Sequence, residues 1–80
     1  LDLHALAWNE YDAKNYKKAV AFSRLALHLD AGNGSLMDTL AKMLFKVKKY
    51  KDALKYKEQA MISDVEKYGK DIQAFRDAVK

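Results

Sequence analysis

The two histidines are the side chains of this sequence best suited to acid–base or metal chemistry. His4 and His28 lie far apart in the chain, and no serine, aspartate or glutamate stands at helical spacing to orient either ring. The sequence contains no HExxH motif, no P-loop, no glycine-rich phosphate loop and no cysteine. His28 is expected near the carboxyl end of a helix, where the helix dipole favours an imidazole. The pattern predicts a protein that is not an enzyme and holds no metal or cofactor.

Lysines are the second group with chemical potential, because a cluster of them attracts anions. The chain has 15 Lys and Arg residues against 11 Asp and Glu, a net charge of +4, and arginine occurs only at Arg24 and Arg76. Seven lysines fall between Lys42 and Lys57, opposed there only by Asp52. Nucleic-acid readers favour arginine forks and interleaved aromatics. We therefore interpret the run as a solvated lysine-rich face, with binding of an anionic ligand or nucleic acid as an alternative.

The composition indicates one small helical domain. The chain has 80 residues, no proline, no cysteine and only three glycines, which excludes a disulfide scaffold and a Cys-based zinc site. Its apolar stretches are too short for a membrane span or a signal peptide. We expect a soluble protein, cytoplasmic by default. Because the sequence begins at Leu1 and not at Met, we also expect it to be a piece of a longer chain.

A shift of 34 residues aligns the first half of the chain with the second. Alanine then falls on alanine at three places, and tyrosine falls on tyrosine once. The matched pairs include Ala7 with Ala41, Ala19 with Ala53, Ala26 with Ala60, Leu6 with Leu40, Tyr11 with Phe45, and Tyr16 with Tyr50. The chain therefore contains two copies of one structural unit.

Each unit is predicted to be a helical hairpin. Apolar residues recur every three or four positions from Leu3 to Tyr11 and again from Tyr16 to Leu27, which is helical spacing. Polar residues at 12–15 separate these two runs, as residues 46–49 do in the second unit. The paired alanines lack a side chain beyond Cβ, so we expect them to let the antiparallel helices approach closely.

This period resembles the tetratricopeptide repeat family over the segment from Leu3 to about Asp64. In the family pattern the first helix has a large residue, then Leu-Gly three and four positions on, which here are Leu3, Leu6 and Ala7. A Tyr-x-x-Ala sequence opens the second helix in both units. The chain departs from the pattern because alanine replaces the glycine twice, the proline between repeats is absent, and Ser23 and Lys57 replace an aromatic residue.

The resemblance implies an all-α, right-handed superhelix of two helical hairpins and a capping helix, five helices in all. We expect repeat 1 at 2–33, repeat 2 at 35–68 and the capping helix at 70–80, in a single domain. The loop at 30–35 separates the repeats, with Gly32 and Gly34 suited to positive φ and Ser35 suited to cap the next helix.

The end of the second repeat has two interpretations. Ser63 to Glu66 reads as a capping box that starts a new helix there. Alternatively, the fourth helix continues to Tyr68, Gly69 stops it, and Asp71 is the N-cap of the last helix. We favour the continuous helix. The last helix then has one apolar face that covers repeat 2, as a terminal repeat requires. That face consists of Ile72, Phe75 and Val79.

The resemblance also implies that the first helix of each repeat lines a concave binding face. Trp and Tyr are enriched at binding hot spots, and Lys42 and Lys46 favour an acidic ligand. We therefore predict a protein-interaction module that binds a peptide or a neighbouring domain. The alternative is that Trp8 and Tyr11 only pack against neighbouring helices or a flanking segment. The predicted groove residues are His4, Trp8, Tyr11, Asp12, Asp38, Lys42, Phe45 and Lys46.

One subclass of the family is expected not to match. Its members clamp the terminal carboxylate of chaperone tails with a lysine and two asparagines, at positions that correspond to His4, Trp8 and Thr39. None of the three is retained, so we predict no tight binding of such tails.

The second helix carries an additional apolar stripe made of Phe22, Leu25 and Leu29. A helix that is apolar on two sides is normally sandwiched, so we expect an adjoining domain, another repeat or a second copy of the chain to cover it. A looser resemblance is to the repeat tail that follows thioredoxin-like domains in some bacterial proteins. It implies a structural accessory without a ligand of its own, and the periplasm as the compartment.

Overall fold

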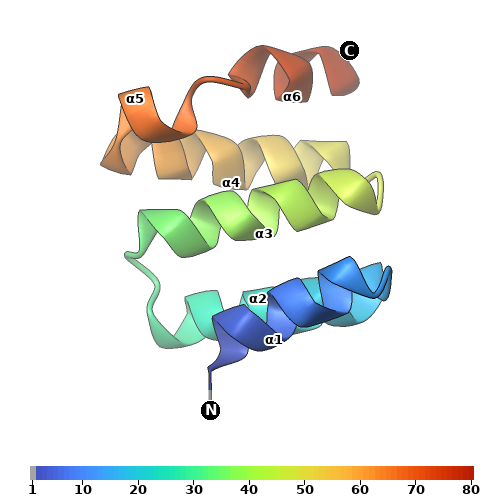
Figure 1. The fold of residues 1–80 in the computed structure, drawn as a ribbon. Helices are drawn as coiled ribbons and strands as arrows, with labels where there is room; N and C mark the ends of the chain where they lie inside the picture. The colour runs from blue at the N-terminus through green and yellow to red at the C-terminus, as the bar shows by residue number, and fades with distance from the viewer. Residues whose placement is uncertain (1) are drawn as a thin grey trace.

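The computed structural model describes residues 2–80, and these residues form helices without any strand. The all-α prediction is confirmed. Figure 1 shows the α1–α2 hairpin and the α3–α4 hairpin stacked in order, with α6 on the far side of the second hairpin. The helices in this part of the chain are α1 (Leu3–Asp12), α2 (Tyr16–Leu29), α3 (Gly34–Lys46), α4 (Tyr50–Ser63), α5 (Val65–Tyr68) and α6 (Ile72–Ala78).

The helix bounds follow the 34-residue shift found in the sequence. Helices α2 and α4 have 14 residues each, and they begin at Tyr16 and Tyr50. Helices α1 and α3 end at Asp12 and Lys46, also 34 residues apart. The periodicity of the sequence therefore repeats in the backbone.

The turns within the two hairpins also match. Lys14 and Lys48 have φ values of 65° and 66°, in the left-handed region that glycine tolerates best. The backbone N–H of Lys14 donates to the carbonyl oxygen of Tyr11 at 3.0 Å, and the equivalent bond from Lys48 to Phe45 is also 3.0 Å. A non-glycine residue thus occupies a strained position in each turn.

The expectation of positive φ at Gly32 and Gly34 is wrong, since none of the described glycines has a positive φ. Gly34 is needed for space instead. A Cβ there would lie 2.7 Å from the Ser63 hydroxyl oxygen and 3.1 Å from the Tyr68 ring. The missing side chain lets the start of α3 approach the end of α4 and α5.

The predicted cap at Ser35 is also wrong. Helix α3 begins at Gly34, and the N-cap is Asn33, whose side-chain oxygen accepts a hydrogen bond from the Leu36 N–H at 3.2 Å. Asparagine caps a helix as well as serine does, and Asn33 precedes the first helical residue.

The predicted packing of the paired alanines is confirmed. Ala7, Ala19, Ala41, Ala53 and Ala60 have no exposed surface, and Ala26 is 7 % exposed. Residues of both repeats share one core cluster, and Phe75 of α6 belongs to it. The cluster contains Ala26, Leu27, Leu36, Leu40, Ala41, Leu44, Ala53 and Phe75.

The fourth helix does not continue to Tyr68, so the favoured interpretation of this region is wrong and the described chain has six helices instead of five. Asp64 is extended, with φ −158° and ψ 98°, and its side chain accepts a hydrogen bond from the Lys67 N–H at 3.0 Å. An aspartate N-cap stabilises the start of a new helix. Asp71 is the N-cap residue of α6, as predicted, but its side chain does not bind the backbone there.

Candidate functional site

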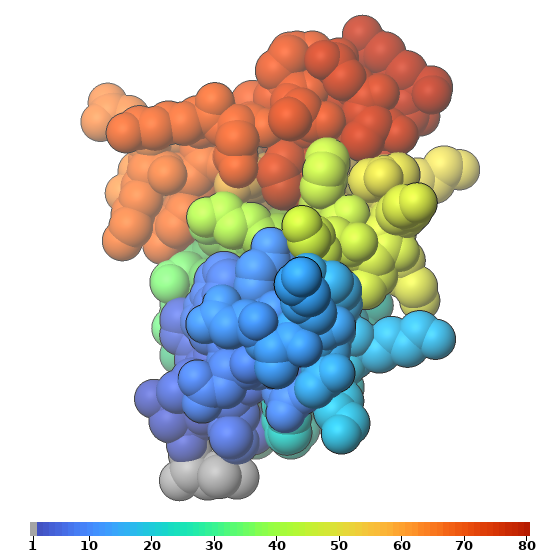
Figure 2. Space-filling model, turned by 45° about the vertical axis from the view of Figure 1, so that its right-hand side comes forward, coloured from blue at the N-terminus to red at the C-terminus, as the bar shows by residue number. Residues whose placement is uncertain are grey.

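A groove lies where α1, α3 and α6 meet, and we call it the front groove. Figure 2 shows α1 in blue and α6 in red on this side of the molecule, with side chains of α3 between them. The groove has a volume of about 370 Å³. It contains five of the eight predicted groove residues and three residues from the C-terminal segment. Its lining is Trp8, Tyr11, Lys42, Phe45, Lys46, Asp71, Ala74 and Phe75.

Two sets of packed aromatic rings contribute residues to the front groove. In the first repeat, Tyr11 lies between Trp8 and Tyr16, with centroid separations of 5.1 and 5.3 Å. In the second, Phe45 lies between Tyr50 and Phe75, at 5.0 and 4.8 Å. Edge-to-face contacts at such distances stabilise aromatic pairs. These rings therefore pack on the protein with one side. Trp8, Tyr11 and Phe45 are only partly buried, whereas Phe75 is 4 % exposed.

The indole of Trp8 is held by a hydrogen-bonded chain that connects α1 with α3. Its Nε1–H donates to His4 Nε2 at 2.9 Å, and Thr39 Oγ1 lies 3.0 Å from the same nitrogen. Because an indole N–H can only donate, His4 Nε2 is the acceptor of this hydrogen bond. His4 thus orients Trp8 and does not line the front groove.

Lys57 is the residue that the sequence interpretation placed wrongly. It is 1 % exposed, so it does not belong to a solvated lysine face. Its Nζ forms ion pairs with Asp38 and with Asp71, the latter at 2.6 Å. Lys42 Nζ lies 3.1 Å from the other oxygen of Asp38. Two lysines and two aspartates therefore compensate one another, as a buried charge requires.

Asp38 is consequently not a free ligand of the groove. Its carboxylate is 13 % exposed and is engaged by both lysines. Asp12, another predicted groove residue, is exposed at the end of α1 and lies outside the groove lining. A signal for the burial of Lys57 was present in the sequence, because this lysine stands four residues after Ala53 and three before Ala60, on the face that those alanines bury.

Two cations reach the front groove from one helix. Lys42 and Lys46 lie one turn apart on α3, and the side chain of Lys42 is 47 % exposed. Lys46 Nζ lies 5.7 Å from the ring centroid of Tyr16 and takes part in none of the ion pairs between residues 2 and 80. The groove therefore offers an ammonium group beside an aromatic wall.

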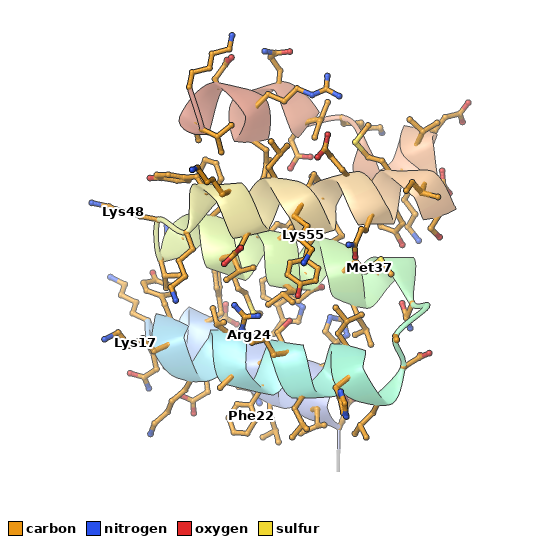
Figure 3. The ribbon with its side chains drawn as sticks, turned by 180° about the vertical axis from the view of Figure 1, so that it is seen from behind. Lys17, Phe22, Arg24, Met37, Lys48 and Lys55 are labelled. Atoms are coloured by element: carbon orange, nitrogen blue, oxygen red, sulfur yellow. The ribbon has the colours of Figure 1, made fainter. Side chains whose placement is uncertain are left out.

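The lysines between 42 and 57 do not form a single patch. Lys57 is buried, and Lys42 and Lys46 line the front groove. Figure 3 shows Lys48 at the end of the molecule and Lys55 on the rear of α4. The positive charge of this segment is thus divided among different faces.

The apolar stripe of α2 is exposed at two of its three residues. Leu25 and Leu29 are 47 % and 71 % exposed, while Phe22 packs partly against the cluster of Ala7, Ala19 and Met43. Figure 3 shows Phe22 on the side of α2 that faces away from the second hairpin. The stripe therefore lies along the free edge of the first hairpin.

No group of three or more His, Cys, Asp or Glu side chains between residues 2 and 80 is placed to hold a metal ion. None of the helices there is both long and apolar enough to cross a membrane. Protein-family models, curated protein sequences and solved structures give no match to this chain.

Proposed function

We propose that the protein is an interaction module of the tetratricopeptide type, with its hairpins stacked in a right-handed superhelix, and that its front groove binds a peptide. The observation that carries the proposal is the groove itself, in which aromatic residues of both repeats and two lysines of α3 meet Phe75 of α6. The matching helix bounds and turns of the two hairpins support the repeat assignment.

The chemistry of the front groove favours a peptide with an acidic and an apolar side chain. Trp8, Tyr11 and Phe45 offer ring surface that an apolar side chain can cover, and aromatic residues are typical anchors of peptide sites. Lys46 has no carboxylate partner among residues 2–80. The single acidic lining residue, Asp71, is engaged by Lys57. An acidic peptide is therefore electrostatically complementary to the groove.

The proposal is tested by selecting peptides from a displayed random library on the immobilised protein and measuring their affinity by calorimetry. We expect acidic and apolar side chains to be enriched among the selected peptides. The substitution Lys46→Gln should weaken binding roughly three- to tenfold, because it removes one charge-assisted contact. The matched control is Lys51→Gln, which removes an exposed lysine outside the groove lining.

The indole resonance of Trp8 provides a second readout in a nitrogen–proton correlation spectrum. It should shift when a selected peptide is added, because the ring lines the groove. Peptides that bind without shifting this resonance, and that bind Lys46→Gln as tightly as the unaltered protein, would show that the front groove is not the site.

A second candidate function is that of a structural accessory packed on an adjoining domain. The observation in its favour is the exposure of Leu25 and Leu29, at 47 % and 71 %. Substitution of both by serine should lower the melting temperature of this chain only modestly, since Leu29 is 71 % exposed and Leu25 is 47 % exposed. If the adjoining domain of the longer protein is produced as a separate polypeptide, the double substitution should abolish its co-purification with this chain. If that association survives, the stripe is not the contact.

A further inference from the structure

A second depression, which we call the rear pocket, lies between α2 and the turn that joins α3 to α4. Its volume is about 350 Å³, and it shares no lining residue with the front groove. Figure 3 shows Lys17 and Arg24 on α2 from this side, with Lys48 of the turn at the same end of the molecule as Lys17. The lining consists of Lys17, Val20, Ala21, Arg24, Val47 and Lys49.

The charged residues that line the rear pocket are all positive. Three of its six lining residues are cations, and none is acidic. Lys17 and Arg24 are seven residues apart and therefore share one face of α2, about 10 Å apart along the helix axis. Lys17, Arg24 and Lys49 take part in none of the ion pairs among residues 2–80. The three charges act together on an anion that enters the pocket.

The neighbouring surface extends this electrostatic pattern. A third depression, next to the rear pocket, shares Arg24 with it and also has no carboxylate in its lining. It continues along α2 past His28 and is closed on the α4 side by Tyr56 and Gln59. An anion at Arg24 therefore meets no acidic lining residue on either side.

The floor of the rear pocket is apolar. Val20 is half-buried and packs against both core clusters, and Val47 is half-buried in the turn. Ala21 adds a small side chain between the cations. Inorganic phosphate would use the charges and leave this floor in water. A ligand with a hydrocarbon or aryl body would cover the floor as well, and the pocket volume lies at the lower end of the range for small-molecule sites.

We propose that the rear pocket binds a small soluble amphiphilic anion, with a carboxylate, sulfonate or phosphate head and an alkyl or aryl body. Arg24 binds the head through its guanidinium group, and Lys17 and Lys49 add positive charge to the lining. The body lies on Val20, Ala21 and Val47. This site is independent of peptide binding in the front groove.

The probe is decyl phosphate below its critical micelle concentration. Inorganic phosphate represents its head group alone, and decanol represents its hydrocarbon body alone. Calorimetry should show that decyl phosphate binds at least tenfold more tightly than either fragment. Arg24→Gln should weaken its binding about tenfold, because a charge-assisted contact is lost. Ala21→Leu should also weaken binding, because the larger side chain occupies the floor.

The matched control is Lys46→Gln in the front groove, which changes the net charge by the same amount and should leave binding of decyl phosphate unaltered. Equal loss in Lys46→Gln and Arg24→Gln would mean a general charge effect and would overturn the site. If inorganic phosphate bound as tightly as decyl phosphate, the proposal that the ligand is amphiphilic would be wrong. Binding to phosphatidic-acid vesicles without binding to decyl phosphate would overturn a soluble ligand.

Discussion

The ammonium group of Lys57 lies between Asp38 and Asp71, and these two aspartates explain how a charge survives at 1 % exposure. Its Nζ also lies 5.1 Å from the ring centroid of Phe75, a favourable position for a cation. Because Asp71 is the N-cap residue of α6, one side chain of α4 holds the last helix against the second hairpin. The ion pairs therefore connect the start of α6 to the second hairpin.

This arrangement predicts an asymmetry between removing the lysine and removing its partners. Lys57→Met should change the free energy of unfolding by no more than about 1–2 kcal/mol, because Met fills the space and Asp38 keeps Lys42. The double substitution Asp38→Asn with Asp71→Asn should cost about 3 kcal/mol or more, because Lys57 is then buried without a counter-charge. Urea denaturation at neutral pH measures both. A larger loss for Lys57→Met would contradict the compensated cluster.

At the scale of the helices, the 34-residue shift predicted buried positions and helix bounds better than the residue types at single positions did. Alanines placed by the shift are buried, and the bounds of α2 and α4 are 34 residues apart. The break at Asp64 was not predicted, because the sequence there supports both a continuous helix and a new start. In the structure Asp64 caps a new helix, and Gly34 lies close to Ser63 and Tyr68, a tertiary contact that local sequence does not contain.

The candidate site was predicted only in part for the same physical reason. The repeat register located Trp8, Tyr11, Lys42, Phe45 and Lys46 in the front groove. It could not locate Asp71, Ala74 and Phe75, since their place depends on how the chain folds back after α5. Its charge alone suggests that Lys57 is exposed. Its burial is tolerated because Asp38 and Asp71 compensate the charge.

The turn between α3 and α4 provides a test of strain at this scale. Lys48 has a φ of 66°, so Lys48→Gly should remove the steric cost of the left-handed conformation and stabilise the protein by about 0.5 kcal/mol, after allowance for the added freedom of the unfolded chain. Lys55→Gly, on the exposed side of α4, should instead cost about 1 kcal/mol. Thermal unfolding followed by circular dichroism compares them. Equal losses would show that the turn is unstrained.

At the scale of the whole molecule, only a few residues are available to cover the apolar surface at the ends of a short stack of helices. The radius of gyration is 11.7 Å, which is expected for a compact domain of this length. Helix α6 covers one end of the stack with Phe75, while Leu25 and Leu29 remain exposed along the edge of the first hairpin. A domain of this size has a total stability of only about 4–12 kcal/mol, so the contact made by α6 is a large share of it.

Phe75→Ala should therefore lower both stability and groove function. The ring is 4 % exposed and contacts Phe45 at a centroid separation of 4.8 Å, so its loss should cost about 3 kcal/mol and lower the melting temperature by roughly 15 °C. Gln73→Ala, on the exposed side of α6, is the control and should leave the melting temperature within about 2 °C.

The same variant distinguishes a cap that only stabilises from one that also shapes the front groove. Well below its melting temperature, Phe75→Ala remains folded, and the affinity for a groove-binding peptide can be measured directly. Because Phe75 and Ala74 form one wall of the groove, we expect the affinity to fall about tenfold or more, as it does when an aromatic anchor is truncated. Unchanged affinity at reduced stability would assign α6 to the fold alone and leave the groove to α1 and α3.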